Sequence, residues 1–448
     1  MVVNQYLGIE SLPERTKTIV RKFLTILVLN TLLLGLSNTF YILNAIDKIG
    51  FTQAAVITTV MLTIQLIFDY PSGSLGDFIG QKWVMTLAYG SYGVAFFLLS
   101  MAETFPIFFL IAIFNGLGNA QASGTIETWL DSNYKKTIGE SDTERKIYGF
   151  MRDRVGLSTN VSLATSFMIG GMLATGFSRQ IVFFLQFFLT IFLIIYVLKN
   201  LNNVKSDNDV TEEISSPRRA YFQYLKGGVR FIFSSKHTFL FIVGLAIYQV
   251  TWLIWFNLIL FPLYFGYTGS DFGTSLIRTI IFLLEIPARF YVANWSTRFK
   301  NEQFPIFLFI HLLIFFPAYL ILFSFLPPQN NFNLIGFLAT ILIMNISNSF
   351  IVRIGYILRD RIIIDLVPSE VRNSVYSLIP TLISIFSIPL LPIAGLMVDH
   401  SGMIAGVAFA FGICITGSII LFISLKLRPF AEGMEDIQPG ITEIVTGR

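Results

Sequence analysis

Three ionisable side chains share one face of an otherwise apolar stretch of the sequence. Arg278 and Glu285 are seven residues apart, and Arg289 follows four residues after Glu285. On an α-helix these spacings place all three on the same side. A carboxyl can take up and release a proton, and a guanidinium can hold an anion or pair with that carboxyl. The spacing also permits a purely structural pair between Glu285 and Arg289, so both interpretations stay open.

Other polar side chains interrupt apolar stretches in ways that suit a binding cavity. Gln249 and Trp252 can face one way on a helix, and Asn257 follows in the same stretch. Polar and aromatic groups together suit a ligand that is partly apolar. Asparagines also recur within the apolar stretches. Each can line the cavity or hydrogen-bond a neighbouring helix. They are Asn30, Asn38, Asn115, Asn119, Asn345 and Asn348. We expect His311, alone among apolar residues, to be a packing residue rather than a proton carrier.

The composition places these residues in a membrane. The chain of 448 residues is 54% hydrophobic and 13% charged, with a mean hydropathy of +0.69, whereas a soluble domain carries about 25% charged residues. The net charge of +4 does not indicate nucleic-acid binding, because the basic residues punctuate apolar runs instead of forming a patch. A single cysteine, Cys414, excludes an internal disulfide, and three scattered histidines offer no metal site. We expect no cofactor and no metal.

Apolar runs bounded by charged residues, proline or glycine predict about twelve membrane-spanning helices, since a span needs about 20 mostly apolar residues. We expect these spans at 20–42, 52–71, 83–101, 105–130, 151–176, 180–199, 238–264, 272–293, 304–326, 333–358, 373–398 and 402–427. The predicted fold is an all-α membrane protein. Polar residues within several spans suit helices that line a wet cavity or pack closely.

The distribution of Lys and Arg gives the expected orientation, because cytoplasmic loops carry an excess of these residues. With the N-terminus inside, the outer loops and outer helix ends hold only Lys48, Arg179 and Arg278 of the 31 Lys and Arg residues. An even number of spans also puts the C-terminus inside. We therefore predict a multi-pass, monomeric protein of the cell (plasma) membrane, surrounded by lipid, with both termini in the cytoplasm.

The chain divides once, into two halves that resemble each other. Residues 200–236 form the longest polar stretch, which we interpret as a cytoplasmic linker with an amphipathic segment on the membrane surface. This division predicts one six-helix bundle at 1–199 and a pseudo-symmetric second one at 237–448, with a cytoplasmic tail. Asp69 stands two residues before a proline in the first half, as Glu285 does in the second. Such correspondences favour an internal duplication, with binding at the boundary of the repeats.

The loop between the second and third predicted spans carries the most specific motif. It reads Gly73-Ser-Leu-Gly-Asp77-Phe-Ile-Gly80-Gln-Lys82 and resembles the loop signature of the major facilitator superfamily, G-x-L-a-D-[RK]-x-G-[RK]-[RK]. The resemblance implies two six-helix bundles and transport by alternating access. It also implies a conformational latch made by Gly73, Asp77, Gly80 and Lys82 with an acid at the end of the fourth span, here Asp131.

The chain departs from the family pattern at several positions. Phe78 and Gln81 replace two basic residues of the loop signature, so the expected latch contains fewer charged residues than in typical members. Drug–proton antiporters of the superfamily carry an arginine in the fourth span where this chain has Ile113. The resemblance therefore does not identify a substrate. Near the latch, we expect Glu127 and Asp131 to form a cytoplasmic ion-pair cluster with the arginines that open the fifth span.

These observations predict a secondary active transporter that moves a small molecule without ATP, since no Walker-type G-x-x-x-x-G-K-[ST] motif is present. Our first expectation is proton-coupled export of a moderately hydrophobic compound, because aromatic residues make up 15% of the chain and fixed charges within the spans are few. The side chains expected to bind substrate or couple the proton are Arg278, Glu285, Asp69, Gln249, Trp252 and Asn257.

Three alternatives stay open. One is uptake of an anionic nutrient with Arg278 as counter-ion, or uniport. Another is a transporter-like sensor that no longer transports, against which the loop motif and the buried charges argue. The third is a multispan membrane enzyme, which would need a convergent cluster such as H-x-x-E-H, whereas His237, His311 and His400 are scattered.

The orientation can be tested by single-cysteine labelling in a Cys414→Ser background. Cysteines placed in 200–236 or 360–370 should react with a membrane-impermeant reagent only from inside, and a cysteine at position 48 only from outside. The measurement is labelling of intact cells against labelling of inverted vesicles. Modification of the central linker from outside would overturn the predicted orientation.

Overall fold

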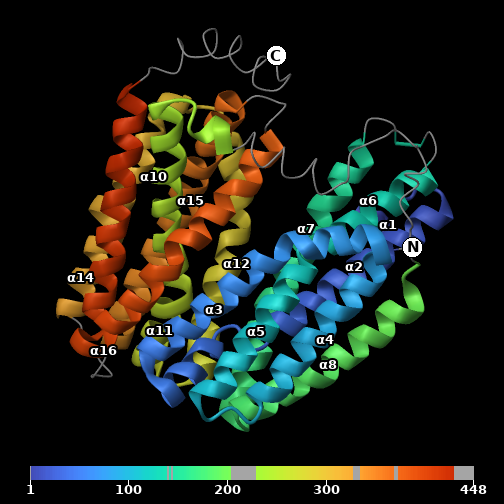
Figure 1. Cartoon of the computed structure of the whole chain (residues 1–448), viewed down its shortest axis with the longest axis horizontal. Coiled ribbons are helices and arrows are strands. Elements are labelled where there is room, and N and C mark those ends of the chain that lie inside the picture. The colour runs from blue at the N-terminus through green and yellow to red at the C-terminus, as the bar shows by residue number, and fades with distance from the viewer. Residues whose placement is uncertain are drawn as a thin grey trace. The chain divides into compact units, whose positions relative to one another are not determined.

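The chain folds into helices connected by short turns. The computed structural model describes residues 2–138, 141–142, 145–202, 229–325, 333–367 and 372–427, and contains no strand within them (Figure 1). The fold is thus all-α, as predicted. Most of the amphipathic segment of the linker (residues 221–228 of 221–233) and the C-terminal tail (428–448) lie outside the described residues.

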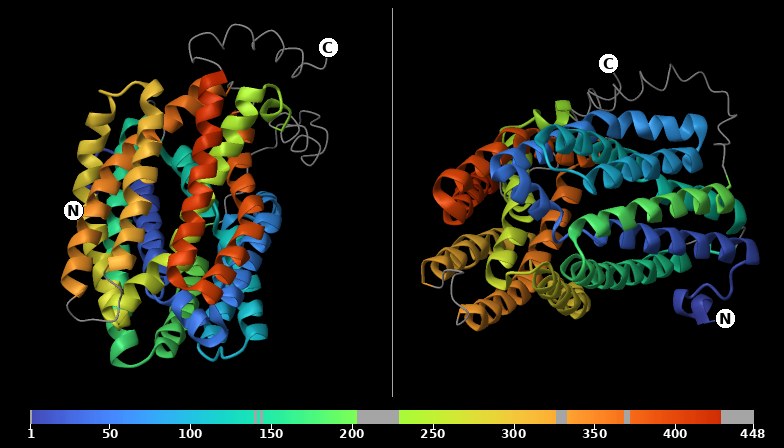
Figure 2. Two further views of the ribbon diagram at one scale, coloured as in Figure 1. Left: turned by 90° about the vertical axis from the view of Figure 1, so that its left-hand side faces the viewer. Right: turned by 90° about the horizontal axis from the view of Figure 1, so that it is seen from below.

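The residues group into two compact units. Unit 1 comprises 1–210 and 268–283, and unit 2 comprises 211–267 and 284–448. These units are groups of residues that contact one another, and they do not test the division into bundles at 1–199 and 237–448. That division stays a prediction. Within each unit the long helices run roughly alongside one another (Figure 2).

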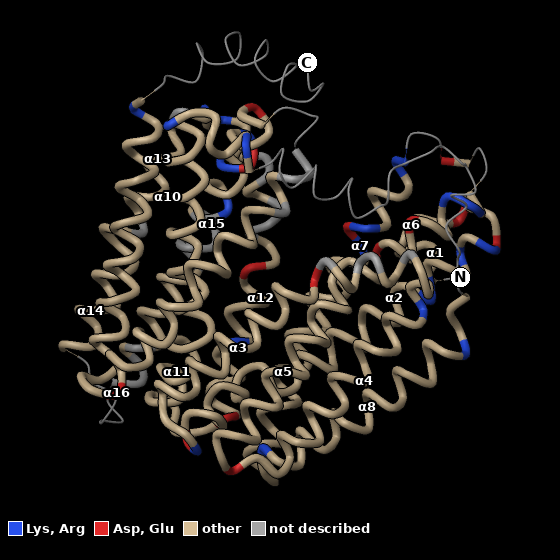
Figure 3. Tube along the Cα trace, in the orientation of Figure 1, with Lys and Arg blue, Asp and Glu red and all other residues tan. Residues whose placement is uncertain are grey.

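Unit 1 is built from the helices of the first half of the sequence and the beginning of one later helix. In chain order these are α1 (Val2–Leu7), α2 (Glu14–Gly35), α3 (Tyr41–Ile79), α4 (Gln81–Leu99), α5 (Phe105–Ala122), α6 (Thr125–Ile138), α7 (Lys146–Gly176), α8 (Arg179–Asn200) and the first part of α12 (Asp271–Ser296). Figure 3 shows long stretches of α4 and α8 without charged residues, which suits helices embedded in lipid.

Unit 2 contains the remaining helices, two of which include a π-helical turn. These are α10 (Lys236–Ile254), η1 (Trp255–Ile259), α11 (Leu260–Thr268), the second part of α12, η2 (Asn301–Gln303), α13 (Phe304–Ile310), η3 (His311–Phe315), α14 (Phe316–Phe325), α15 (Asn333–Leu366) and α16 (Arg372–Leu427). The π-turns η1 and η3 each lie inside a run of helix long enough to cross a bilayer. Such turns are frequent at functional sites.

Eight helices in the described part of the chain are long and apolar enough to cross a membrane. They are Glu14–Gly35, Tyr41–Asp69, Phe105–Ile138, Lys146–Gly176, Arg179–Asn200, Lys236–Thr268, Phe304–Phe325 and Leu378–Leu427. Two glycines with positive φ interrupt the longest helical runs, Gly50 (φ 78°) in α3 and Gly402 (φ 79°) in α16. Gly402 is the first residue of the last predicted span, so the break in α16 lies where the last two predicted spans meet. The multi-pass membrane architecture is confirmed, and the count of twelve stays a prediction.

Glycines let two helices of unit 1 touch at their backbones. A Cβ at Gly170 of α7 would lie 1.7 Å from the carbonyl oxygen of Leu36, and one at Gly35 of α2 would lie 1.9 Å from Oγ of Ser166. No larger residue fits either place without separating α2 from α7. Close approach through small residues is the usual means of helix packing in lipid, where the hydrophobic effect no longer drives association.

The same device joins α10 and α16 in unit 2. A Cβ at Gly417 would lie 2.5 Å from the backbone nitrogen of Tyr248, and one at Gly244 would lie 2.9 Å from that of Leu421. The two helices consequently run side by side (Figure 1). They hold the side chains of α10 in fixed positions for the site described below.

A buried carboxylate fixes the start of α7. Asp142 accepts backbone N–H groups of Ile147 (3.0 Å) and Tyr148 (2.9 Å) and the hydroxyl of Tyr134 (2.9 Å). Burial acts to raise the pKa of the Asp142 carboxyl, but the backbone N–H groups and the Tyr134 hydroxyl outweigh it and hold the pKa below its ordinary value. The ionised carboxylate therefore stabilises the turn between α6 and α7.

This cap predicts a pH-dependent stability. A carboxyl whose pKa is lowered on folding contributes stability that is present above its unfolded pKa of about 3.9 and is lost as the pH falls through the folded pKa. Asp142→Asn should therefore cost about 1 kcal/mol at pH 7, and its difference from the parent should begin to shrink below about pH 4 and be lost as the pH falls through the folded pKa. Thermal unfolding of the purified protein in detergent between pH 3 and pH 7 measures this difference.

The matched control is Asp153→Asn, which removes an exposed carboxyl from the same helix and should change stability little at any pH. A deficit in Asp142→Asn that stays undiminished at pH 3 would contradict the assignment of the cap to the ionised carboxylate.

Candidate functional site

The structure brings Glu285 of α12 to Arg353 of α15, an arginine that the sequence analysis did not single out. Nη2 of Arg353 lies 3.5 Å from Oε2 of Glu285, and the two side chains are 28% and 20% exposed. At this separation the two groups attract as charges more than they form a directed hydrogen bond. The alternative partner Arg289 has a side chain outside those described.

A second polar pair lies one turn further along α15. Tyr356 follows Arg353 by three residues, about 4.5 Å along the helix axis, and its side chain hydrogen-bonds Gln249 of α10. The guanidinium of Arg359 stacks 4.6 Å from the Tyr356 ring centre and donates to Asp360 at 2.7 and 2.8 Å. Gln249, predicted as a substrate residue, is thus held beside the charged pair.

A small, mostly apolar cavity lies beside this second pair. Its polar wall consists of Tyr248, Tyr356 and Arg359, and the remainder comes from apolar residues of α10 and α13. Gly355 also lines it, and a Cβ there would lie 3.1 Å from Phe307. The site therefore combines a charge pair, an amide–phenol pair and apolar walls, all in unit 2.

Arg278 lies in the first part of α12, which belongs to unit 1. Its guanidinium stacks 5.5 Å from the ring centre of Phe282, and Phe282 packs edge-on against Phe167 of α7. Arg278 and Glu285 share a helix face as predicted from their spacing, yet the described contacts of Arg278 lie in unit 1 and the partner of Glu285 lies in unit 2. Their joint role in one path stays a prediction.

Asn257 lies in the π-turn η1, and Trp252 lies in α10 just before that turn. Trp252 is buried and packs edge-on against Phe315 with ring centres 5.2 Å apart. Asn257 donates its side-chain amide to the carbonyl of Leu253 on the same helix at 2.9 Å. These contacts give both residues a packing role at the turn, and a role toward substrate stays a prediction.

The polar residues of unit 1 form a chain of hydrogen bonds across three helices. Tyr92 of α4 donates to Asn119 of α5 (2.8 Å), and Asn119 donates to Gln65 of α3 (3.3 Å). Asn115 donates to the hydroxyl of Tyr41 at 3.2 Å. The sequence left two roles open for Asn115 and Asn119, lining a cavity or bonding a neighbouring helix. Their observed contacts are hydrogen bonds between helices.

Asp69 and three further predicted residues have simpler surroundings. Asp69 is exposed near the end of α3, and its carbonyl accepts the hydroxyl of Ser72 at 2.7 Å. Asn345 donates to a carbonyl of its own helix at 2.9 Å. The side chains of His311 and Asn348 lie outside those described.

The structure places the latch residues at the junctions around α3, α4 and α6. Gly80 has a φ of 91° and separates α3 from α4, and Lys82 lies 5.9 Å from the ring centre of Trp83. Gly73 and Asp77 fall within α3, and their surroundings lie outside the described contacts. The latch therefore stays a prediction for this chain.

Asp131 has ion-pair partners other than those expected. It contacts Lys135 at 2.9 Å and Arg145 at 3.0 Å, while Arg152 and Arg154 stack on aromatic rings. The expectation pointed to Arg152 and Arg154 because they open the fifth predicted span. The turn capped upstream of α7 brings Arg145 to Asp131 instead.

Arg353 could have been found from the sequence, because it is the one charged residue in the predicted span 333–358. By contrast, nothing in the sequence marked Tyr356 as the partner of Gln249. In the part of the chain that the structure describes, no three His, Cys, Asp or Glu side chains meet as a metal site would need.

Comparison with known proteins places the chain in a family. The family model described as Major Facilitator Superfamily matches residues 23–357. A comparison with curated proteins gives no match.

Several solved structures share the fold. The nucleoside transporter NupG has a TM-score of 0.69 and 11% identity, over 91% of this chain and 98% of that one. A D-xylose-proton symporter has a TM-score of 0.63 and 11% identity, over 94% and 98%. A bacterial homologue of the human lysosomal transporter Spinster, solved in an inward-facing and unoccupied conformation, has a TM-score of 0.62 and 12% identity, over 92% of this chain and 96% of that one.

The family model matches well over half of the length of this chain. This chain therefore belongs to the major facilitator superfamily, and it is a transporter of the membrane rather than an enzyme.

Proposed function

We propose that this protein is a secondary active transporter that couples proton movement to the export of a small, moderately hydrophobic compound. The observation that carries the proposal is the pair of Glu285 and Arg353 within the helices of unit 2. An ionisable side chain within a membrane-spanning helix is costly to insert, so its presence indicates a functional task.

Protonation gives this pair a means of changing state. A proton on Glu285 removes the charge that faces Arg353, so the attraction between α12 and α15 weakens. A ligand or proton that interacts differently with two conformations shifts their populations by that difference. The fold shared with a D-xylose-proton symporter supports testing the proton first as the coupling ion.

The surroundings of the pair support a substrate that is partly apolar. The ring of Tyr356 and the small apolar cavity beside it offer apolar surface, and Gln249 offers an amide. Ligand sites of this kind bind mainly through apolar contacts, while a few polar groups set orientation. Export through the plasma membrane, with both termini in the cytoplasm, completes the proposal.

A second candidate is uptake of an anion. Arg353 carries a guanidinium beside the same wall, and a protonated Glu285 would leave it able to hold a carboxylate or phosphate. In that case Arg278, the counter-ion that we first expected, would act together with Arg353. The sign of the charge on the transported compound separates the two candidates.

The coupling role predicts a specific defect in Glu285→Gln. Using a ligand found by thermal-shift screening of the purified protein, the variant should bind the ligand with parental affinity but fail to accumulate it against a gradient in proteoliposomes. Exchange of labelled for unlabelled ligand, which needs no proton, should continue. The control is Glu103→Gln, since Glu103 lies in the turn between α4 and α5, far along the chain from α12, and pairs with Lys48. Proton-driven accumulation that survives Glu285→Gln would remove the coupling role and direct attention to Asp69.

The pairing itself predicts non-additive stability. Glu285→Gln and Arg353→Gln should each lower the free energy of unfolding by about 1–2 kcal/mol, because each leaves a partly buried charge without its counter-charge. The double variant should recover much of the loss. Thermal unfolding in detergent measures all three.

The matched double variant Glu285→Gln with Arg289→Gln tests the alternative pair. If Arg353 is the partner, the effects of these two changes should simply add. Recovery in this double variant, and none in the double variant with Arg353→Gln, would assign the pair to Arg289 instead.

A further inference from the structure

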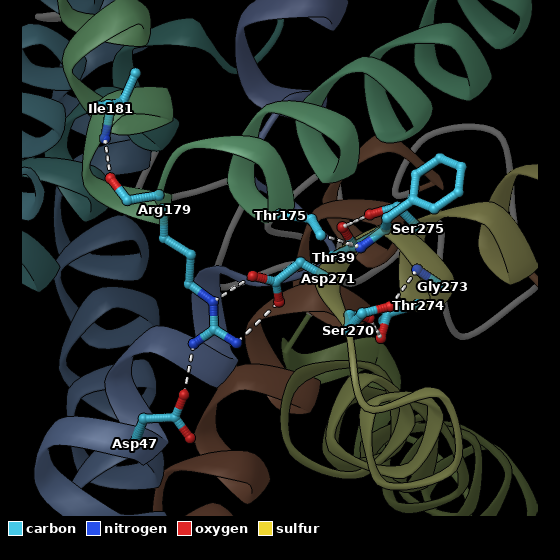
Figure 4. A network of polar contacts seen from close by, with 12 residues as sticks. Thr39, Asp47, Thr175, Arg179, Ile181, Ser270, Asp271, Gly273, Thr274 and Ser275 are labelled. Atoms are coloured by element: carbon cyan, nitrogen blue, oxygen red, sulfur yellow. Dashed lines mark hydrogen bonds and ion pairs between the residues drawn. The ribbon is translucent and has the colours of Figure 1, made fainter. Parts of the chain in front are cut away.

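Arg179, the first residue of α8, holds two carboxylates at once (Figure 4). Its Nε and Nη2 donate to the two oxygens of Asp271 at 2.8 Å each, and its Nη1 donates to Asp47 at 2.6 Å. The Arg179 and Asp271 side chains are 12% and 9% exposed, whereas that of Asp47 is 54% exposed. The bidentate contact with Asp271 is therefore the strong one, and Asp47 is a second partner at the edge.

Asp271 begins a row of polar contacts along one face of α12. The backbone N–H of Phe272 donates to Oγ1 of Thr175 at 2.8 Å, and the hydroxyls of Ser275 and Thr39 lie 2.6 Å apart. Thr279 donates to the carbonyl of Ala164 at 3.2 Å. Residues 271, 275 and 279 are successive i, i+4 neighbours, so they form one stripe.

The stripe lies very close to α7. A Cβ at Gly171 would lie 2.4 Å from the Ser275 side chain and 2.9 Å from the carbonyl oxygen of Asp271. Apart from the aromatic contact of Phe282, the described contacts of this stripe are hydrogen bonds and one ion pair. They join the first part of α12 to α7, to α8 and to Thr39 in the turn before α3, all within unit 1.

The start of α12 does not depend on these contacts. Ser270 accepts the backbone N–H of Gly273 at 3.0 Å, as an N-cap residue does. Thr274 donates to the carbonyl of Ser270 at 2.9 Å. The first turn of α12 is thus capped by its own residues and keeps its form if the stripe separates.

Three groups of the contact, Arg179, Ser275 and Thr279, each have an alternative partner on their own side. Arg179 retains Asp47 if Asp271 leaves, because Asp47 belongs to α3. A serine or threonine within a helix can donate to the carbonyl four residues earlier, an option open to Ser275 and Thr279. A buried guanidinium without any counter-charge is strongly unfavourable, and Asp47 removes that obstacle.

We propose that the first part of α12 is a releasable clamp in which Arg179 binds Asp271 in the closed form and is retained by Asp47 in the released form. The proposal rests on alternating access as the proposed mode of transport, since α12 is one continuous helix whose first part belongs to unit 1 and whose second part belongs to unit 2. Asp271 sets how firmly the clamp closes, and Asp47 sets how readily it opens.

The two acids therefore have opposite effects on opening. Loss of Asp271 removes the strong contact of the closed form and favours release. Loss of Asp47 affects the released form most, because there it is the remaining counter-charge of Arg179, and so it disfavours release. A merely structural ion-pair cluster would loosen in both cases.

The experiment measures the reactivity of a cysteine behind the clamp. Ser275→Cys in a Cys414→Ser background places one thiol in the stripe, where the native side chain is fully buried. The rate of modification by N-ethylmaleimide in nanodiscs, without substrate or proton gradient, reports the released population. Asp271→Asn should raise this rate roughly tenfold, Asp271→Glu should restore it partly, and Asp47→Asn should lower it below the parental rate.

Two controls separate release from general loosening. Glu14→Gln breaks the exposed ion pairs with Lys17 and Arg21 at the start of α2 and should leave the rate unchanged. A second reporter, Thr190→Cys, lies fully buried where α8 packs on Gly93 of α4 and should react at the same rate in every variant. Faster modification of this reporter in Asp271→Asn would overturn the proposal, because the helices of unit 1 would then be coming apart.

A parental rate in Asp271→Asn would also overturn the clamp, and a rate in Asp47→Asn equal to or above the parental rate would overturn the role of Asp47. These outcomes are independent of cargo and coupling. Intact accumulation in Glu285→Gln together with the expected labelling pattern would remove the proposed coupling and leave the clamp in place.

Discussion

Hydrocarbon offers no hydrogen-bonding partner, so each polar group in a membrane-spanning helix must find one inside the protein. Most polar side chains described here meet this constraint locally. The amides of Asn257 and Asn345 donate to carbonyls of their own helices, and Thr58 and Thr59 do the same. Gln186 of α8 is fully buried and donates to a carbonyl of the neighbouring α2. Such groups hold helices together without adding charge.

Charged side chains cannot meet the constraint in this way, because a carbonyl of the same helix does not neutralise them. Each needs a counter-charge, and where that charge comes from another helix the pair ties the two helices together. Glu285 ties α12 to α15, and Asp271 ties α12 to α8. Both pairs act on α12, whose two parts belong to different units. The state of this helix thus depends on two separate electrostatic contacts about 14 residues apart, roughly 21 Å along its axis.

The sequence was sufficient for the architecture because that follows from the same constraint. Long apolar runs, the loop beginning at Gly73 and the glycines that permit close packing are all visible in it, and the family match confirms what they indicated. The partners were harder to predict. Spacing along a helix identifies neighbours such as Glu285 and Arg289, but it cannot show that Arg353, 68 residues later, lies opposite Glu285.

The same limit applies to the ends of helices. Arg179 and Asp271 lie at or beyond the edges of predicted spans, where charged residues are ordinary and attract no interpretation. Only the fold brings them together with Asp47. The left-handed conformation of Arg145, with a φ of 54°, is another such case. It allows this side chain rather than Arg152 to reach Asp131, and no residue pattern required it.

The two charge pairs on α12 differ in the way that each can separate. A carboxyl can be neutralised by a proton, so the pair of Glu285 and Arg353 can weaken through chemistry at one member. The guanidinium of Arg179 does not lose its proton under physiological conditions. It can therefore leave one carboxylate only if a second carboxylate takes over as its counter-charge. Asp47 is that acid, and its exposure at the edge keeps it hydrated while Asp271 is buried. A proton-labile pair in one unit and a partner-exchanging pair in the other would let a proton act on one part of α12, while the other part moves without leaving the Arg179 guanidinium unpaired.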